Sequence, residues 1–237
     1  MAKIVPENLE LPSDCESFFL GEILVIKKWH FDFSACLNLQ KSCQEAVRTR
    51  KLKAIYLFVN HPHCFTLGRG NERGQGDLLE FDPAIREKLS FPLFDIHRGG
   101  GLTYHYPGQW IFYPIIKITP QYSLNDHMCW LLRLIRDYLQ QTYELPAIAT
   151  QKIMGVWIHK KKIASIGVGL NRFVTEHGIA FNLNEDTLMS QELLKINPCG
   201  LKPQTYTFLN KELRLTNIPV ESFHQGILQQ LVTSEGL

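Results

Sequence analysis

Two residues that lie far apart in the sequence, Cys199 and Lys162, have side chains suited to thiol chemistry. Cys199 stands in an Asn-Pro-Cys-Gly segment at residues 197–200, where Pro198 restricts the backbone and Gly200 frees it. A cysteine in this setting is expected on an accessible loop, and a thiol becomes reactive as a thiolate beside a cation. The other interpretation of Cys199, which we accept for the remaining five cysteines, is an inert small hydrophobic residue.

Lys162 is a candidate cation for such a thiolate. It ends a run of three lysines and begins the alternating segment KIASIGVGL at residues 162–170, whereas Lys160 and Lys161 suit a solvated turn. A lysine that is partly desolvated in a cleft can exchange protons near neutral pH. Beside a thiol it would also favour the thiolate. The sequence spacing alone does not establish that Lys162 and Cys199 meet.

A glycine-rich segment at residues 98–109, RGGGLTYHYPGQ, is poorly suited to packing and well suited to binding a ligand. Glycine lets backbone amides approach a bound group that a Cβ would keep away. The segment lacks the GxxxxGK[ST] pattern of a P-loop and the spacing of a dinucleotide fingerprint. We therefore expect it to form one wall of a small-molecule site.

Two histidines, His105 and His177, are alternative acid–base groups. A Cys-His hydrolase would place one of them beside Cys199. Taken singly, each is more often a structural hydrogen-bonding residue. The sequence leaves both interpretations open.

A cluster of His61, His63 and Cys64 offers three atoms of the types that bind metals. In an extended chain, His63 and Cys64 would point to opposite faces, and no fourth ligand is spaced nearby. We interpret the segment as a loop with surface histidines and predict no metal site.

The composition bounds the class of protein. The chain has 237 residues, 45% of them hydrophobic, which suits a globular protein of one domain. Its net charge of +2 is too mild for nucleic-acid binding and weakly compatible with an acidic protein partner. The six cysteines lack CxxC pairs and no secretory signal precedes them, so we expect reduced thiols in the cytoplasm. No apolar run reaches the roughly 20 residues of a membrane span.

The hydrophobic pattern predicts an α+β fold, a layered mixed or antiparallel sheet with flanking helices. Residues 1–20 are expected to be a loosely ordered N-terminal extension, and residues 21–237 a single catalytic domain. Ser123 and Asp126 predict a capping box at the start of a long helix. Helices are predicted at residues 32–50, 82–89, 123–142, 187–194 and 219–231, and strands at 22–28, 54–59, 91–97, 102–106, 110–118, 153–158, 162–170 and 173–183.

Six short motifs follow one another along about residues 20–210. They are TLGRG (66–70), RGGGLTYHYPGQ (98–109), GVW (155–157), KIASIGVGL (162–170), TEHGIAFN (175–182) and NPCG (197–200). This combination resembles the lipoyl(octanoyl) transferase family, the octanoyl-acyl carrier protein:protein octanoyltransferases. That family shares its α+β fold with biotin-protein and lipoate-protein ligases, so the resemblance implies the same kind of layered sheet.

The resemblance also implies a reaction, the first step of lipoate biosynthesis. An octanoyl group would pass from octanoyl-acyl carrier protein to one lysine of a lipoyl domain through an acyl-cysteine intermediate, without a cofactor. The acceptors would be lipoyl domains of 2-oxoacid dehydrogenase complexes or the glycine cleavage H protein. Carried over by motif, Cys199 would be the nucleophile and Lys162 its acid–base partner. His177, an acid–base candidate from its residue type, is a candidate supporting residue. The substrate-binding residues would be Arg98, Gly99, Gly100, Gly101, Leu102, Thr103, Tyr104, His105, Ser165, Ile166, Gly167, Gly178, Ile179 and Ala180.

Three alternatives remain open at the level of sequence. An ATP-dependent lipoate or biotin ligase on the same fold would adenylate a free acid, and the NPCG motif argues against it because a ligase needs no cysteine nucleophile. A relay enzyme would move octanoyl or lipoyl between two protein domains. A non-enzymatic relative would only bind an acylated domain and would form no adduct on Cys199.

Overall fold

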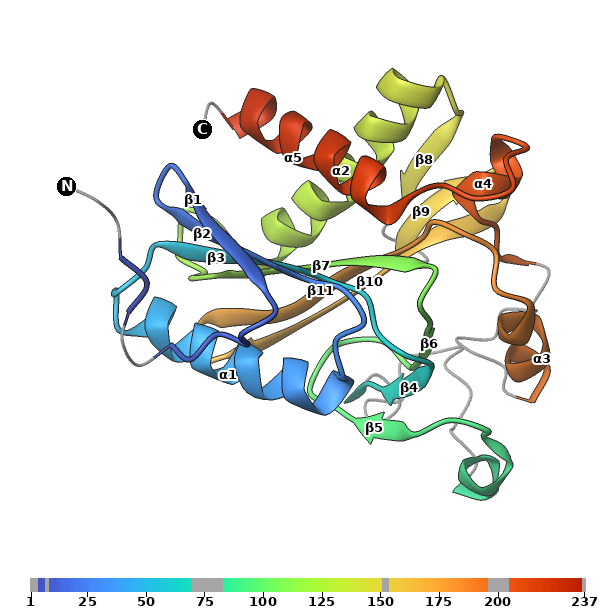
Figure 1. Cartoon of the computed structure of the whole chain (residues 1–237), viewed down its shortest axis with the longest axis horizontal. Helices are drawn as coiled ribbons and strands as arrows, with labels where there is room; N and C mark the ends of the chain where they lie inside the picture. The colour runs from blue at the N-terminus through green and yellow to red at the C-terminus, as the bar shows by residue number, and fades with distance from the viewer. Residues whose placement is uncertain (1–3, 7–8, 70–82, 151–153, 196–204, 236–237) are drawn as a thin grey trace.

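An eight-stranded mixed sheet forms the centre of the molecule (Figure 1). The structure, a computed structural model, describes residues 4–6, 9–69, 83–150, 154–195 and 205–235. The strand order in this sheet is β1-β2-β3-β7-β11-β10-β9-β8. The strands are β1 (Glu16–Leu20), β2 (Ile23–Lys28), β3 (Ala54–Val59), β7 (Gln109–Ile116), β8 (Ala147–Thr150), β9 (Gly155–Ile158), β10 (Lys161–Asn171) and β11 (Val174–Asn182).

Helices cover both faces of this sheet. Helix α1 (Phe33–Arg48) crosses from β2 to β3, and these two strands are therefore parallel, whereas the other neighbouring strands are antiparallel. Figure 1 shows α1 on one face and α2 (Leu124–Tyr143) with α5 (Val220–Glu235) on the other. The predicted α+β architecture of a mixed sheet with flanking helices is confirmed.

Helices α1 and α2 each begin at a residue whose side chain caps the first turn. Asp32 accepts a hydrogen bond from the amide of Ala35 at the start of α1. Ser123 and Asp126 form the predicted capping box, in which the Asp126 carboxylate accepts from the Ser123 amide and the Ser123 hydroxyl accepts from the Asp126 amide. The apolar stripes of both helices pack on the sheet and form its two cores.

A second sheet of three strands carries the glycine-rich segment. It has the order β5-β4-β6, with β4 (Cys64–Leu67), β5 (Leu93–Asp95) and β6 (Leu102–His105). The three glycines lie between β5 and β6, and residues 106–108 lead from β6 into β7 of the large sheet. Shorter elements are the 3₁₀ helix η2 (Pro83–Lys88), α3 (Thr187–Lys195) and α4 (Leu209–Glu212).

Three sequence expectations differ from the structure. The end of the predicted loose N-terminal extension, residues 16–20, is strand β1, which pairs antiparallel with β2. Strand β8 was not predicted at all. His61 is not a surface histidine: its ring is fully buried, and its Nδ1 donates to the carbonyl of Phe31 over 2.7 Å. The prediction of a surface position was wrong because the carbonyl of Phe31 gives the buried imidazole a hydrogen-bond partner, which the sequence alone does not reveal.

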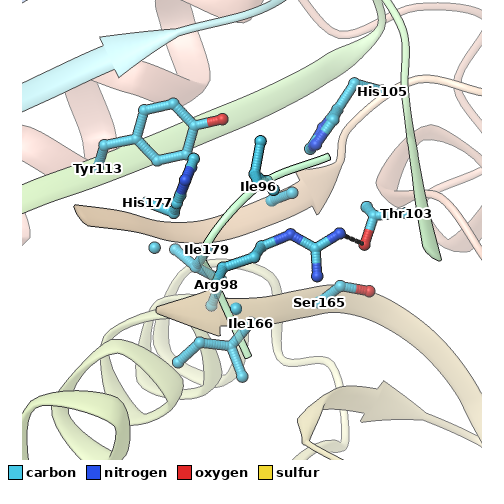
Figure 2. A pocket seen from close by; sticks show the side chains of 12 residues that line it. Ile96, Arg98, Thr103, His105, Tyr113, Ser165, Ile166, His177 and Ile179 are labelled. Carbon is cyan, nitrogen blue, oxygen red and sulfur yellow. Dashed lines mark hydrogen bonds between the residues drawn. The ribbon is translucent and has the colours of Figure 1, made fainter. Parts of the chain in front are cut away.

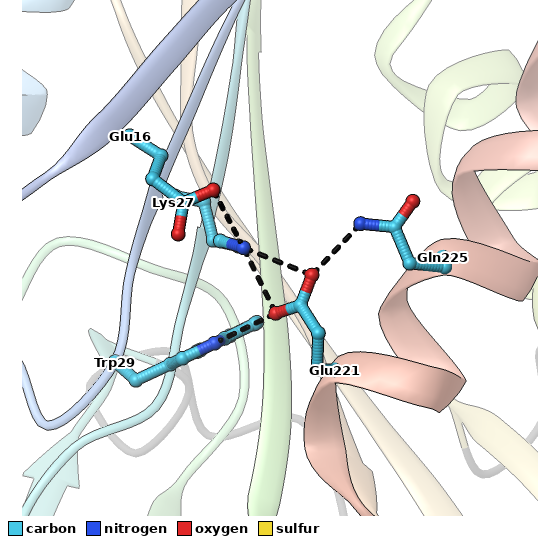
Figure 3. Close-up of polar contacts among 5 residues, drawn as sticks. All are labelled: Glu16, Lys27, Trp29, Glu221 and Gln225. Atoms are coloured by element: carbon cyan, nitrogen blue, oxygen red, sulfur yellow. Dashed lines mark hydrogen bonds and ion pairs between the residues drawn. The ribbon is translucent and has the colours of Figure 1, made fainter.

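A charged cluster fastens α5 to the edge of the large sheet (Figure 3). The ammonium of Lys27 on β2 donates to both carboxylate oxygens of Glu221 on α5, over 2.9 and 2.8 Å. Trp29 and Gln225 donate to the same carboxylate. Because Lys27 is almost fully buried, this ion pair is shielded from solvent on one side.

Neither a membrane span nor a metal cluster is found in the described ranges. No helix there is long and apolar enough to cross a bilayer. No group of three or more histidine, cysteine, aspartate and glutamate side chains there is arranged to hold a metal ion.

Candidate active site

Pairing between β10 and β11 brings the predicted substrate-binding segments together. In the antiparallel register, Ser165 faces Ala180, Ile166 faces Ile179 and Gly167 faces Gly178. The glycine-rich segment joins them because the amide of Gly99 donates to the carbonyl of Val168 on β10 over 3.1 Å. Segments that are far apart in the sequence therefore form one continuous wall.

Arg98 fixes the geometry of the glycine-rich segment. Its guanidinium is buried and donates to the carbonyl and hydroxyl of Thr66, to the hydroxyl of Thr103 and to the carbonyl of Gly99, over 2.8 to 2.9 Å. These acceptors come from β4, β6 and the segment itself. Gly100 has a φ of +79°, a conformation that favours glycine over any residue with a Cβ.

Two adjoining cavities lie along this wall. They share the residues Arg98, Thr103, Ser165 and Ile166. The cavity that contains Lys162, called the outer cavity, is lined in addition by Gly100, Gly101, Leu102, Tyr104, Gln109, Lys162, Asn182, Met189 and Tyr206. The cavity farther along the wall from Lys162, called the inner cavity (Figure 2), is lined in addition by Ile96, His105, Tyr113, Gly167, His177, Gly178, Ile179 and Ala180. Of the predicted substrate-binding residues, all but Gly99 line one of the cavities.

Lys162 lies at the outer cavity and is 6% exposed. It stands at an irregularity of the β9–β10 pairing, where the register shifts between Lys162 and Ala164. Its Nζ lies 5.8 Å from the ring centroid of Trp157, and its carbonyl accepts from the amide of Thr207 over 3.0 Å. A buried lysine that opens onto a cavity can deliver or accept a proton there without competition from bulk solvent.

Gly155 makes room for the Lys162 side chain. A Cβ built at Gly155 would lie 2.5 Å from Cε and 3.4 Å from Nζ of Lys162. The GVW motif thus has a physical role that its sequence alone did not reveal.

Burial keeps the histidines of the site neutral at pH 7. It lowers the pKa of His105 well below its ordinary value, and nearby His61 lowers it further. Burial, aided by the charge of Arg98, lowers the pKa of His177 to about 3. A neutral imidazole does not supply the positive charge that stabilises a thiolate, and an imidazole of lowered pKa is a weak base, so both histidines suit a Cys-His pair less well than an ordinary histidine would.

Cys199 lies outside the described residues. The described chain on either side of its segment does reach the site: Met189 on α3 and Tyr206 both line the outer cavity with Lys162. Tyr206 also forms a parallel β-bridge with Lys162. The predicted meeting of Cys199 with Lys162 stays a prediction.

The sequence analysis missed several residues of the cavity walls. Gln109 and Asn182 face each other on β7 and β11, and the Gln109 amide donates to the Asn182 side chain over 3.2 Å. His105 donates from Nδ1 to Gln109 over 2.7 Å, so this network links the two cavities. Gln109 and Asn182 each end one of the six motifs, which was the available signal. Ile96, Tyr113, Met189 and Tyr206 carried no such signal.

These features define a ligand-binding α+β domain with a buried lysine at its cavity. The chain matches the lipoyl protein ligase A/B catalytic domain family over residues 32–232 and belongs to that family. It is 32% identical to an octanoyltransferase of Desulforamulus reducens over 80% of this chain and 81% of that one. It is 35% identical to an octanoyltransferase of Solibacter usitatus, over 73% and 77% of the two chains. The resemblance seen in the six motifs is confirmed.

Solved structures with the same fold include two lipoate-protein ligases. One is a putative lipoate protein ligase from T. acidophilum with bound lipoic acid, with a TM-score of 0.62 at 13% identity over 92% of this chain and 87% of that one. The other is lipoate-protein ligase A bound with ATP, with a TM-score of 0.64 at 13% identity over 92% and 86% of the chains. At this identity the likeness establishes the fold alone.

Proposed function

We propose that this chain is an octanoyltransferase that acts through a thioester on Cys199, with Lys162 as its acid–base partner. The observation that carries the proposal is the position of Lys162. Its buried side chain opens onto the outer cavity, and that cavity is also lined by Met189 and Tyr206, which lie on either side of the segment with Cys199. The identity to curated octanoyltransferases supports the same activity.

In the first half-reaction, the Cys199 thiolate attacks the carbonyl carbon of the octanoyl thioester on the carrier protein. A new carbon–sulfur bond forms, the bond to the phosphopantetheine sulfur breaks, and the protonated Lys162 gives its proton to the departing sulfur. One thioester replaces another, so the step needs no ATP.

In the second half-reaction, the amine of a lipoyl-domain lysine attacks the acyl-enzyme. Lys162, now neutral, takes a proton from the attacking nitrogen while the Cys199 thiolate leaves. The products are an octanoyl amide on the acceptor and the starting pair of thiolate and ammonium. A single lysine therefore serves as acid in one half-reaction and as base in the other.

The two cavities are the proposed site of the octanoyl chain. The carbonyl end lies at the outer cavity with Lys162, and the hydrocarbon continues into the inner cavity, where Ile96, Ile166 and Ile179 offer apolar contacts. Burial of the chain gains about 0.8 kcal/mol per methylene.

The proposed donor is octanoyl-acyl carrier protein, and the proposed acceptors are lipoyl domains of 2-oxoacid dehydrogenase complexes or the glycine cleavage H protein. The five described cysteines are free thiols, which suits the proposed cytoplasmic location.

A donor comparison tests the proposal. Purified protein is incubated with an apo lipoyl domain and either octanoyl-acyl carrier protein or free octanoate with ATP. We expect octanoylation of the lipoyl domain from the carrier protein without ATP. Transfer only from octanoate with ATP would indicate a ligase, and transfer only from an acylated lipoyl domain would indicate a relay enzyme.

A further inference from the structure

One residue of the inner cavity wall has a buried polar atom without a hydrogen-bond partner in the part of the chain that the structure describes. Among the described residues, five buried side-chain atoms lack a hydrogen-bond partner. They are Tyr106 Oη, Trp110 Nε1, His127 Nε2, His177 Nε2 and His224 Nδ1. Of these five residues, His177 is the one that lines either cavity of the candidate active site. Because an unsatisfied buried polar group is costly, this nitrogen is a natural binding point for a ligand atom.

The His177 ring is held firmly in place. It is 2% exposed and lies parallel to the ring of Phe33, with 6.5 Å between centroids, and perpendicular to the ring of Tyr113 at 5.8 Å. Figure 2 shows it beside Tyr113 at the wall of the cavity. Its backbone has a φ of +59°, and its amide donates to the side chain of the buried Gln40 on α1 over 2.9 Å. Gln40 therefore helps to hold His177 in a conformation that few non-glycine residues adopt.

The neighbouring aromatic side chains that carry polar atoms already have partners. His105 donates from Nδ1 to Gln109, and its Nε2 lies 3.3 Å from the hydroxyl of Thr66. The hydroxyl of Tyr113 lies 3.2 Å from Nε2 of His61. Among the rings that line the inner cavity, His177 is therefore the one with a nitrogen left for a polar ligand atom, and the Ser165 side chain lines the same cavity.

His177 is neutral at physiological pH, because burial and the nearby Arg98 lower its pKa to about 3. A neutral imidazole carries one donor and one acceptor nitrogen, and the tautomer can adapt to the ligand. A hydroxyl group, which is both donor and acceptor, can pair with either form of Nε2.

The inner cavity would receive the distal end of the acyl chain. Lys162 lines the outer cavity and not the inner one, and the two cavities are joined along Arg98, Thr103, Ser165 and Ile166. A chain whose carbonyl lies beside Lys162 therefore extends its last carbons toward His177.

We propose that His177 Nε2 forms a polar subsite that binds a hydroxyl group on one of the last carbons of an acyl chain of about eight carbons. The subsite rests on the proposed octanoyl transfer and extends its substrate class to acyl groups that carry an oxygen near the distal end. An unsubstituted octanoyl chain leaves His177 Nε2 without a hydrogen-bond partner, whereas a hydroxyl near the distal end of the chain would provide one.

The test compares octanoyl- and 8-hydroxyoctanoyl-acyl carrier protein as donors for acyl-enzyme formation, measured by intact mass. The readout is the ratio of kcat/KM for the hydroxylated donor to kcat/KM for the plain donor. His177→Phe keeps an aromatic ring but removes the nitrogen, and should lower this ratio about tenfold, which corresponds to about 1.4 kcal/mol for one buried hydrogen bond. Tyr106→Phe is the matched control, because it also removes a buried polar atom without a partner but lines neither cavity, and it should leave the ratio unchanged.

The outcomes separate this subsite from the proposed activity. If octanoyl loads onto Cys199 but the ratio is the same in His177→Phe, Tyr106→Phe and the unchanged protein, the polar subsite is wrong and the transferase stands. If neither donor loads, the transferase proposal itself fails. Should His177→Phe not fold, ¹⁵N NMR of labelled histidine in the unchanged protein replaces it. The His177 Nε2 resonance must then differ between the hydroxyoctanoyl and octanoyl acyl-enzymes, and identical resonances would overturn the subsite.

Discussion

Gly155 and Lys162 pack so closely on β9 and β10 that position 155 has no room for a side chain. A Cβ there would lie 2.5 Å from Cε of Lys162 and 2.5 Å from the carbonyl oxygen of Ala164. Non-bonded carbon atoms prefer separations of about 3.5–4.0 Å, so the lysine would have to move. Gly155 is therefore a positioning residue for the proposed acid–base group.

We expect Gly155→Ala to slow octanoylation of Cys199 about 100-fold, since a displacement of about 1 Å at a catalytic group has an effect of this order. Single-turnover mass spectrometry measures the rate, and thermal unfolding shows whether the variant is folded. Thr150→Ala changes the residue that pairs with Gly155 on β8, and should keep the rate of the unchanged protein. A folded Gly155→Ala protein with an unchanged rate would show that Lys162 does not need this space.

Substitutions of Lys162 distinguish the effect of its positive charge on Cys199 from its proposed role in proton transfer. Lys162→Arg keeps a positive charge but cannot exchange the proton, because the guanidinium stays protonated in proteins. We expect it to retain fast alkylation of Cys199 at pH 7 and to lose transfer to the lipoyl domain by about 10²–10⁴-fold. Lys162→Met should lose both reactions. Equal transfer rates in Lys162→Arg and the unchanged protein would rule out the acid–base role.

Much of the fold was predictable because its signals are local. Fully buried β3 is a continuous apolar run, and α1 and α2 have helical stripes with clear caps. Strands β1 and β8 are the two edges of the large sheet, and most of their side chains are exposed or half-buried. Neither sequence, ESFFL or AIAT, alternates apolar and polar residues, so neither carries the periodic signal of a half-buried strand.

Residues of the site were predicted from the sequence only where the family resemblance assigned them a role. The contact of Gln109 with Asn182 joins strands that are 73 residues apart, and the room that Gly155 leaves for Lys162 depends on strand pairing. Neither relationship has a local signal. His61 shows the same limit, because its burial depends on Phe31 and Tyr113 and not on its neighbours in the sequence.

The glycine-rich segment allows a matched pair of substitutions. Gly100 has a φ of +79°, whereas a Cβ at Gly99 would make only an ordinary contact, 3.7 Å from the carbonyl of Val168. Alanine in the left-handed conformation costs about 1–2 kcal/mol, so we expect Gly100→Ala to distort the wall of the outer cavity and raise KM for octanoyl-acyl carrier protein. Gly99→Ala should have a much smaller effect. Equal KM values for the two variants would contradict a role for the Gly100 conformation.

The Lys27–Glu221 pair predicts a pH dependence of stability. Partial burial alone would raise the pKa of Glu221, but hydrogen bonds from Lys27, Gln225 and Trp29 outweigh it and lower the pKa from 4.5 to about 2. The folded state thus binds this proton more weakly than the unfolded state does. The resulting stability is fully present above about pH 4.5 and is lost as the pH falls toward 2.

We therefore expect Glu221→Gln to have a lower Tm than the unchanged protein at pH 7, with a difference that shrinks between pH 4.5 and 2. Thermal unfolding across this pH range measures it. Contributions from His61 and His177 are common to both proteins and cancel in the difference, whereas the charge of Glu221 raises the pKa of His224 and so adds to the difference. Glu16→Gln is the control, because Glu16 also pairs with Lys27 over 2.9 Å but is mostly exposed, and its effect should be smaller. A Tm difference that does not vary with pH would exclude the charge of Glu221 as its cause.

The most direct test of the account is the mass of the protein after incubation with octanoyl-acyl carrier protein in the absence of an acceptor. We predict an increase equal to one octanoyl group, located on the peptide that contains Cys199, and its disappearance when an apo lipoyl domain is added. Cys199→Ala should remain folded, gain no mass and transfer no octanoyl group. Transfer to the lipoyl domain by Cys199→Ala at the rate of the unchanged protein would contradict the proposed mechanism.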